Sequence, residues 1–168
     1  MNFYKIRRYR FKRKSVGFTL VELVVVVSII AIISGISIFA VNSARTSGRD
    51  AKRKGDLAQI ASGLEMYKSD CNYYPRSLPS VGSSLTGNSS FGCTVAAASS
   101  NIYIQALPGD PGGSNYGYTV YPSGCLNNCT RFCLWAKLED SSTTLPSYCN
   151  ASFCGSVPAG FNYCLTSP

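Results

Sequence analysis

The sequence predicts an α+β protein in which one long N-terminal helix packs on a small antiparallel β-sheet head stapled by disulfides. Three observations predict this fold. A run of apolar residues reaches Val41, and an amphipathic pattern without proline follows it as far as Tyr74. All eight cysteines lie from Cys71 onward, in a part of the chain rich in Tyr, Ser, Gly and Pro.

Residues 1–17 form a basic leader. They hold seven of the sixteen Lys and Arg residues and none of the eight acidic residues. Because Lys and Arg before a membrane segment keep that side in the cytoplasm, we expect a cytoplasmic N-terminus and an exported remainder. From Phe18 onward, nine basic and eight acidic side chains leave a net charge of +1. The total charge of +8 therefore does not indicate nucleic-acid binding.

Residues 18–42 are predicted to be a transmembrane and assembly helix, since about 20 apolar residues cross a bilayer. Glu22 is the only charged residue in this segment. A carboxylate in a membrane helix is costly without a partner, so Glu22 is a candidate functional residue. A plain single-pass anchor with Glu22 at the interface is the alternative. A conventional signal peptide fits less well, because no small-residue cleavage site follows the apolar run.

The chain resembles the type IV pilins and the pseudopilins of type II secretion and competence systems. The resemblance lies in the basic leader followed by Gly17-Phe18-Thr19-Leu20-Val21-Glu22. It implies that a prepilin peptidase cuts between Gly17 and Phe18 and methylates the new amino group of Phe18. Gly17 has no side chain to hinder a protease. The resemblance also implies that Glu22 neutralises the Phe18 ammonium of a neighbouring subunit, an attraction that is strong at low dielectric.

Residues 43–70 are predicted to be the amphipathic half of the same helix, which runs from about Phe18 to Ser69. Apolar residues recur at helical spacing, at Leu57, Ile60, Ala61, Leu64 and Tyr67. A charged belt from Arg45 to Lys54 precedes this stripe. Two interpretations of the belt stay open: a boundary with the membrane or the next subunit, and a solvated helix face.

Residues 71–168 are predicted to be a disulfide-rich globular head. An even number of cysteines in an exported domain indicates a disulfide framework. Zinc is the competing interpretation, but the chain lacks histidine and a pair of C-x-x-C knuckles. Eight cysteines allow 105 pairings, so the connectivity stays open. The candidate disulfide residues are Cys71, Cys93, Cys125, Cys129, Cys133, Cys149, Cys154 and Cys164.

Within the head, residues 76–100 are predicted to be a surface loop with a short helix near Val95–Ala98. Residues 116–121 and 132–138 are predicted to be antiparallel strands, from their aromatic and β-branched content. Tyrosines at alternate positions of the first strand favour sheet packing, with ligand stacking as the alternative. The segment Leu107-Pro108-Gly109-Asp110-Pro111 before this hairpin is similar to the major pseudopilins.

No catalytic motif is present. The chain has no histidine, no phosphate-binding glycine loop and no G-x-S-x-G elbow, so we expect no enzyme activity and no cofactor. Some pseudopilins bind calcium in a downstream loop. Here the acidic candidates are Asp110, Glu139 and Asp140, which are too few and too scattered in sequence for six to eight oxygen ligands, and no metal site is predicted.

We therefore expect a structural subunit of a type IV pilus or pilus-like filament, with a pseudopilin of a secretion or DNA-uptake system as the alternative. The resemblance implies a homo-oligomeric helical filament as the assembled form. Prepilin peptidase, an assembly ATPase and a membrane platform are the implied partners. The precursor is expected in the cytoplasmic membrane and the assembled filament outside it. A nucleic-acid partner has no support in the sequence.

Overall fold

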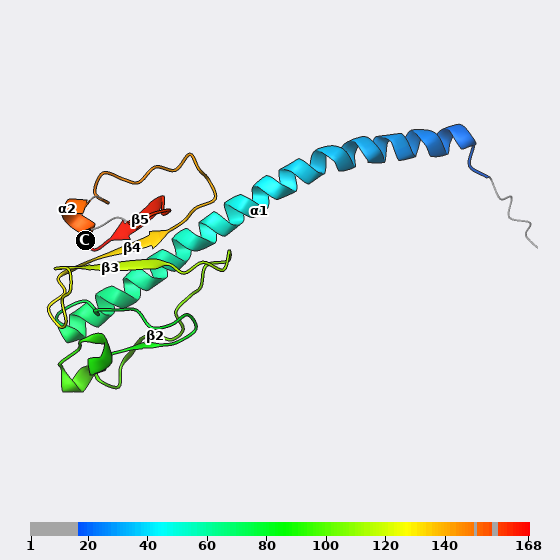
Figure 1. Ribbon diagram of the computed structural model, residues 1–168. Helices are drawn as coiled ribbons and strands as arrows, with labels where there is room; N and C mark the ends of the chain where they lie inside the picture. The colour runs from blue at the N-terminus through cyan, green and yellow to red at the C-terminus, as the bar shows by residue number, and fades with distance from the viewer. Residues whose placement is uncertain (1–16, 150, 156–157) are drawn as a thin grey trace, which may run out of the picture. The chain divides into compact units, whose positions relative to one another are not determined.

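The computed structural model describes residues 17–149, 151–155 and 158–168 (Figure 1). Two compact units make up the chain, Met1–Val41 and Asn42–Pro168. Helix α1, Leu20–Cys71, contributes residues to both units. Most of the basic leader lies outside the described residues, which begin at Gly17.

Helix α1 begins at a side-chain cap and ends at a left-handed residue. Thr19 Oγ1 accepts a hydrogen bond from the backbone N–H of Glu22 at 3.2 Å, which satisfies one of the free donors of the first turn. At the other end, Asn72 has a φ of 67°, a conformation that stops a helix. The helix therefore begins two residues after the predicted start, Phe18, and ends two residues after the predicted end, Ser69.

The head holds a three-stranded antiparallel sheet in the order β3-β4-β5. Strands β3 (Gly117–Tyr121) and β4 (Arg131–Ala136) form the predicted hairpin, with Tyr118 opposite Leu134. Strand β5 (Tyr163–Thr166) pairs with β4 and was not predicted. Four residues without apolar alternation give little sequence evidence for a strand.

The segment predicted as a surface loop carries more structure than expected. The short helix predicted near Val95–Ala98 is present as the 3₁₀ helix η2, whereas strand β1 and the 3₁₀ helix η1 were not predicted. Strand β1 pairs with β2 just beyond this segment. The bounds of these elements are β1 Leu85–Thr86, η1 Ser89–Phe91, η2 Ala96–Ala98 and β2 Ile102–Ile104. A one-turn helix, α2 (Ala151–Cys154), lies in the tail.

The core of the Asn42–Pro168 unit forms between α1 and one face of the sheet. The predicted helical stripe is buried there, since Leu57, Ile60 and Leu64 are fully buried and pack with Phe132 and Leu134 of β4. Figure 1 shows this part of α1 running along the sheet. The α+β prediction, with a long helix on a small antiparallel sheet, is confirmed.

The opposite face of β4 belongs to a second cluster, because successive side chains of a strand point to opposite faces. Cys133 and Trp135 lie there, packed with three further cysteines. The structure pairs all eight cysteines, as Cys71–Cys93, Cys125–Cys129, Cys133–Cys154 and Cys149–Cys164. The first bridge joins the end of α1 to the following loop, and the last two hold the tail on the sheet.

Candidate functional site

The segment Gly17–Glu22 opens the described chain. Gly17, Phe18 and Thr19 precede the helix, and the Phe18 side chain is 84% exposed. Glu22 lies in the first turn of α1, where a carboxylate interacts favourably with the helix dipole. Among the described residues, the ion pairs all lie within Asn42–Pro168 and none involves Glu22.

The apolar part of α1 is exposed in the single chain. Its large side chains from Leu20 to Ile36 are between 49% and 78% exposed. By length and composition this is a helix that can cross a membrane, and its most apolar window is not buried inside the protein. A continuous apolar surface of this kind requires lipid or a protein partner.

A buried ion cluster holds the second part of α1 against two segments of the head. The guanidinium of Arg53, a residue only 3% exposed, contacts three carboxylates. The distances from its nitrogens are 2.6 Å to Asp50 Oδ1, 3.0 Å to Asp110 Oδ1 and 2.9 Å to Glu139 Oε1. Asp110 follows β2 and Glu139 follows β4, so one helical side chain joins two distant segments.

Two neighbours of Arg53 complete this cluster. Asp50 accepts hydrogen bonds from the backbone N–H groups of Glu139 and Asp140, at 2.9 and 3.0 Å. Arg49 donates to both carboxylate oxygens of Glu139, through Nε and a terminal nitrogen. Bidentate pairs of this kind fix orientation as well as distance.

The cluster shows that the charged belt is only partly a solvated helix face, and its interpretation as a boundary with the membrane or the next subunit stays a prediction. Arg49, Asp50 and Arg53 face the head, whereas Arg45 and Lys52 are exposed. The sequence did contain an indication that was missed. Arg53 lies one turn before Leu57 on the same helical stripe, so its side chain points towards the core.

The cluster shifts the pKa values of its members. Hydrogen bonds from Arg49 lower the pKa of Glu139 to about 2, with a further contribution from Arg53, although desolvation opposes the shift. Burial acts to raise the pKa of Asp50, but the N–H groups of Glu139 and Asp140 and the guanidinium of Arg53 hold it below its ordinary value. These carboxylates therefore stay charged over the physiological pH range.

We expect acid to weaken the Asn42–Pro168 unit through Glu139. The pKa of Glu139 is lower in the folded chain than its unfolded value of 4.5. The contribution of its carboxylate to the free energy of unfolding is therefore fully present above pH 4.5 and is lost as the pH falls towards about 2. Thermal unfolding followed by circular dichroism across this interval measures the effect. The Glu139→Gln variant should lose less stability on acidification, and equal losses in both proteins would contradict the account.

The acidic residues considered for calcium lie closer together than their sequence positions suggest. Asp110 and Glu139 converge, but the group between them is the Arg53 guanidinium. Over the residues that the structure describes, no cluster of three or more His, Cys, Asp or Glu side chains could hold a metal ion. We propose no metal site.

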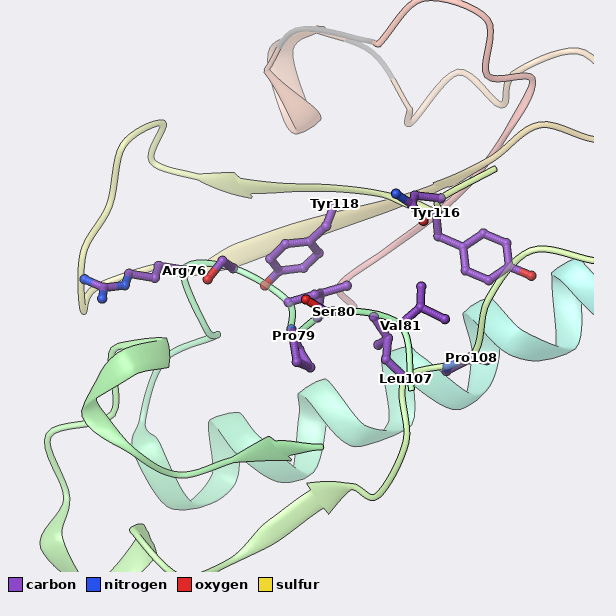
Figure 2. A pocket seen from close by; sticks show the side chains of 11 residues that line it. Arg76, Pro79, Ser80, Val81, Leu107, Pro108, Tyr116 and Tyr118 are labelled. Carbon is purple, nitrogen blue, oxygen red and sulfur yellow. The ribbon is translucent and has the colours of Figure 1, made fainter. Parts of the chain in front are cut away.

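The tyrosines of the hairpin pack against the core. Tyr116 and Tyr118 are partly buried, and the ring of Tyr118 stacks on Phe132 with centroids 6.5 Å apart. Tyr121 is 39% exposed, with the guanidinium of Arg131 4.1 Å from its ring centroid. Packing accounts for the first two tyrosines, which also line a cavity on the head (Figure 2).

Comparison with known proteins identifies sequences that are similar to this chain. The family model of the prokaryotic N-terminal methylation motif matches residues 12–38. The chain is 34% identical over 110 residues to type II secretion system core protein G of Pseudomonas aeruginosa, which covers 64% of this chain and 75% of the relative. The core protein G of Escherichia coli is 29% identical, with 61% and 70% covered.

The same protein of Aeromonas hydrophila is 29% identical, with 62% of this chain and 73% of the relative covered. No solved structure matches the chain. These relatives are named as secretion-system components, which favours the pseudopilin alternative over the pilus subunit expected from the sequence. They also agree with a structural rather than an enzymatic role.

Proposed function

Because the chain belongs to the type IV pilin and pseudopilin family, we propose that it is a pseudopilin, a filament subunit of a type II secretion system. The observation that carries this proposal is the similarity to core protein G over 110 residues. The match covers most of the relative's length, so it extends beyond the N-terminal motif. The exposed apolar helix and the disulfide-bonded head fit such a role.

In the proposed maturation, each of the four segments predicted from the sequence has its own role. Residues 1–17 are removed, 18–42 anchor the precursor and later assemble, 43–70 pack on the head, and 71–168 form the head. A prepilin peptidase cleaves after Gly17 and methylates Phe18. Two observations support this step: the methylation motif spans the bond, and the Phe18 side chain is largely exposed.

On assembly, the apolar part of α1 leaves its contacts with lipid and packs against neighbouring copies of the chain. The precursor lies in the cytoplasmic membrane with its N-terminus inside, and an assembly ATPase with its membrane platform extracts it. In the filament, Glu22 of one subunit pairs with the Phe18 ammonium of the next. The absence of an ion-pair partner for Glu22 among the described residues supports this assignment.

A face of small residues on α1 suits close contact between subunits. Exposed small residues recur at helical spacing on the side away from the core, at Gly48, Ala51, Gly55, Ala58 and Ser62. Glycine inside a helix costs about 1 kcal/mol relative to alanine. A Cβ added at Gly48 or Gly55 meets no atom within 4 Å, so packing inside the described chain does not require either glycine. Small residues let helices approach closely.

We expect Gly55→Trp to prevent filament formation without unfolding the subunit. The added side chain points into open space in the single chain but fills the gap that a neighbouring helix needs. Filament recovered by shearing and sedimentation measures the effect. Gly55→Ala is the matched control and should assemble like the parent. Equal filament yield from Gly55→Trp would exclude this face as a subunit contact.

Deletion of the gene separates the secretion role from the pilus role. A pseudopilin deletion stops the export of secreted proteins and leaves surface pili in place. Loss of surface pili with normal secretion would overturn the proposal in favour of a pilus subunit. Plasmid-borne wild-type protein should restore secretion in the deletion strain.

A further inference from the structure

Two exposed charges of opposite sign lie on one side of α1, far apart along the helix. Lys52 and Asp70 are separated by 18 residues, or about five helical turns, so both side chains leave α1 in the same direction. Within the described part of the chain, neither residue forms an ion pair. The exposed positions between them on this side are uncharged, namely Gly55, Ala58, Gln59, Ser62 and Met66.

Two neutral donors hold the Asp70 carboxylate in place. Its Oδ2 accepts hydrogen bonds from Asn101 Nδ2 at 3.0 Å and from the Tyr103 hydroxyl at 2.8 Å. Neither donor carries a charge, so these bonds orient the carboxylate without neutralising it. Asp70 also lies in the last turn of α1, where the helix dipole favours cations over anions. A carboxylate fixed in this position gains from a cation supplied by a partner.

An apolar patch lies beside Asp70. The side chains of Met66 on α1 and Ile102 on β2 are 53% and 62% exposed. Both line the same surface depression as Asp70, and β2 runs beside the end of α1 (Figure 1). The methionine side chain is flexible and adapts its shape to the surface that it contacts. The end of α1 thus presents an apolar contact with a fixed negative charge at its edge.

A surface with the opposite features lies five turns earlier on the same helix. Met66 follows Gly48 by 18 residues, the same separation as between the two charges. Gly48 has no side chain, and a Cβ added there meets no atom within 4 Å, so the space above it is open. The exposed Lys52 lies one turn further on. This part of α1 thus offers an open space with a positive charge at its edge.

We propose that Asp70 of one copy of the chain pairs with Lys52 of a second, parallel copy that is shifted by about 27 Å along α1, which is 18 residues at 1.5 Å each. The same shift brings Met66 level with the open space at Gly48. Small residues allow this close approach of two helices.

This contact rests on the proposed filament role and names the surfaces that meet in it. Two different surfaces of one chain form a heterologous contact, which leaves one surface of each kind free at the two ends. Such a contact therefore continues into an open filament when its rotation does not close a ring. The opposite charges select the offset between copies, because any other offset leaves them unpaired.

Charge reversal in the full chain tests this pairing. We expect Asp70→Lys and Lys52→Asp each to lower the yield of sheared filament by about tenfold, since each places two like charges together. The double variant restores an opposite pair and should recover most of the yield. Lys137→Asp reverses an exposed charge outside α1 and should assemble like the parent. Circular dichroism checks that each variant is folded, because Asp70→Lys also removes a hydrogen-bond acceptor.

A crosslink locates the contact. Benzoylphenylalanine in place of Met66, activated by light in assembled filaments, should join a second copy within residues 48–52, as mass spectrometry of the linked peptides would show. A crosslink to another segment, single reversals with the parent's yield, or a double variant no better than its single variants would each overturn this contact. Filaments of the parent chain would still support the proposed function in those cases. A parent chain that forms no filament would overturn both.

Discussion

Replacing Arg53 by leucine is expected to destabilise the Asn42–Pro168 unit by about 3–5 kcal/mol, the usual result of removing one partner from a buried charge pair. The change leaves Asp50 and Asp110, both buried, without their cation. It also releases Glu139 from one of its two guanidinium partners. Unfolding by guanidinium chloride, followed by circular dichroism on the detergent-solubilised chain, measures the loss.

Lys52→Leu is the matched control for this experiment. Lys52 is exposed and lies next to Arg53 on the same helix, so its replacement should change stability by less than about 0.5 kcal/mol. The double variant Arg53→Leu with Asp110→Asn should recover part of the loss, because one uncompensated charge is removed. If Arg53→Leu and Lys52→Leu were equally stable, the cluster would not hold the head on α1.

Replacing Glu22 by glutamine is expected to reduce filament yield by about a hundredfold, since a charge-assisted pair contributes up to about 3 kcal/mol. Glutamine keeps the size of the side chain and removes its charge. In the proposed pairing, the Phe18 ammonium of the neighbouring subunit would then lose its counterion. The Thr19 cap uses the backbone N–H of residue 22 and survives the change. Sheared filament compared with total membrane-bound subunit measures the effect.

Glu22→Asp is the control that retains the charge on a shorter side chain, and it should assemble better than Glu22→Gln. Processing must be checked in each variant, so that failed cleavage after Gly17 is not mistaken for failed assembly. Wild-type filament yield from a correctly processed Glu22→Gln protein would contradict the pairing of Glu22 with Phe18.

The elements that sequence patterns predicted are those with a strong local pattern. Helix α1 combines an apolar run with a stripe that includes Leu57 and Ile60, and the β3–β4 hairpin is rich in aromatic and β-branched residues. Strands β1, β2 and β5 have two to four residues each and are set by pairing across the chain. Local propensity carries little information about such short strands.

The candidate site also contains residues that a local motif predicts and residues that only the fold brings together. Gly17, Phe18 and Glu22 were predicted as site residues because they belong to one short motif in the sequence, and their roles stay predictions. The position of Arg53 on the helical stripe indicates only that its side chain points towards the core. Its partners Asp110 and Glu139 lie 57 and 86 positions away, so no local motif reveals them. The cysteine pairing is a further case, because spacing alone cannot indicate which of the many pairings the folded head brings together.

The measurement that tests the central proposal most directly is intact-mass and N-terminal peptide analysis of the protein recovered from cells. A pseudopilin made by this pathway begins at Phe18, carries one methyl group on its amino terminus, and lacks the eight cysteine hydrogens lost in disulfide formation. A chain that still carries residues 1–17 would contradict the account, because Glu22 would then have no Phe18 ammonium to neutralise.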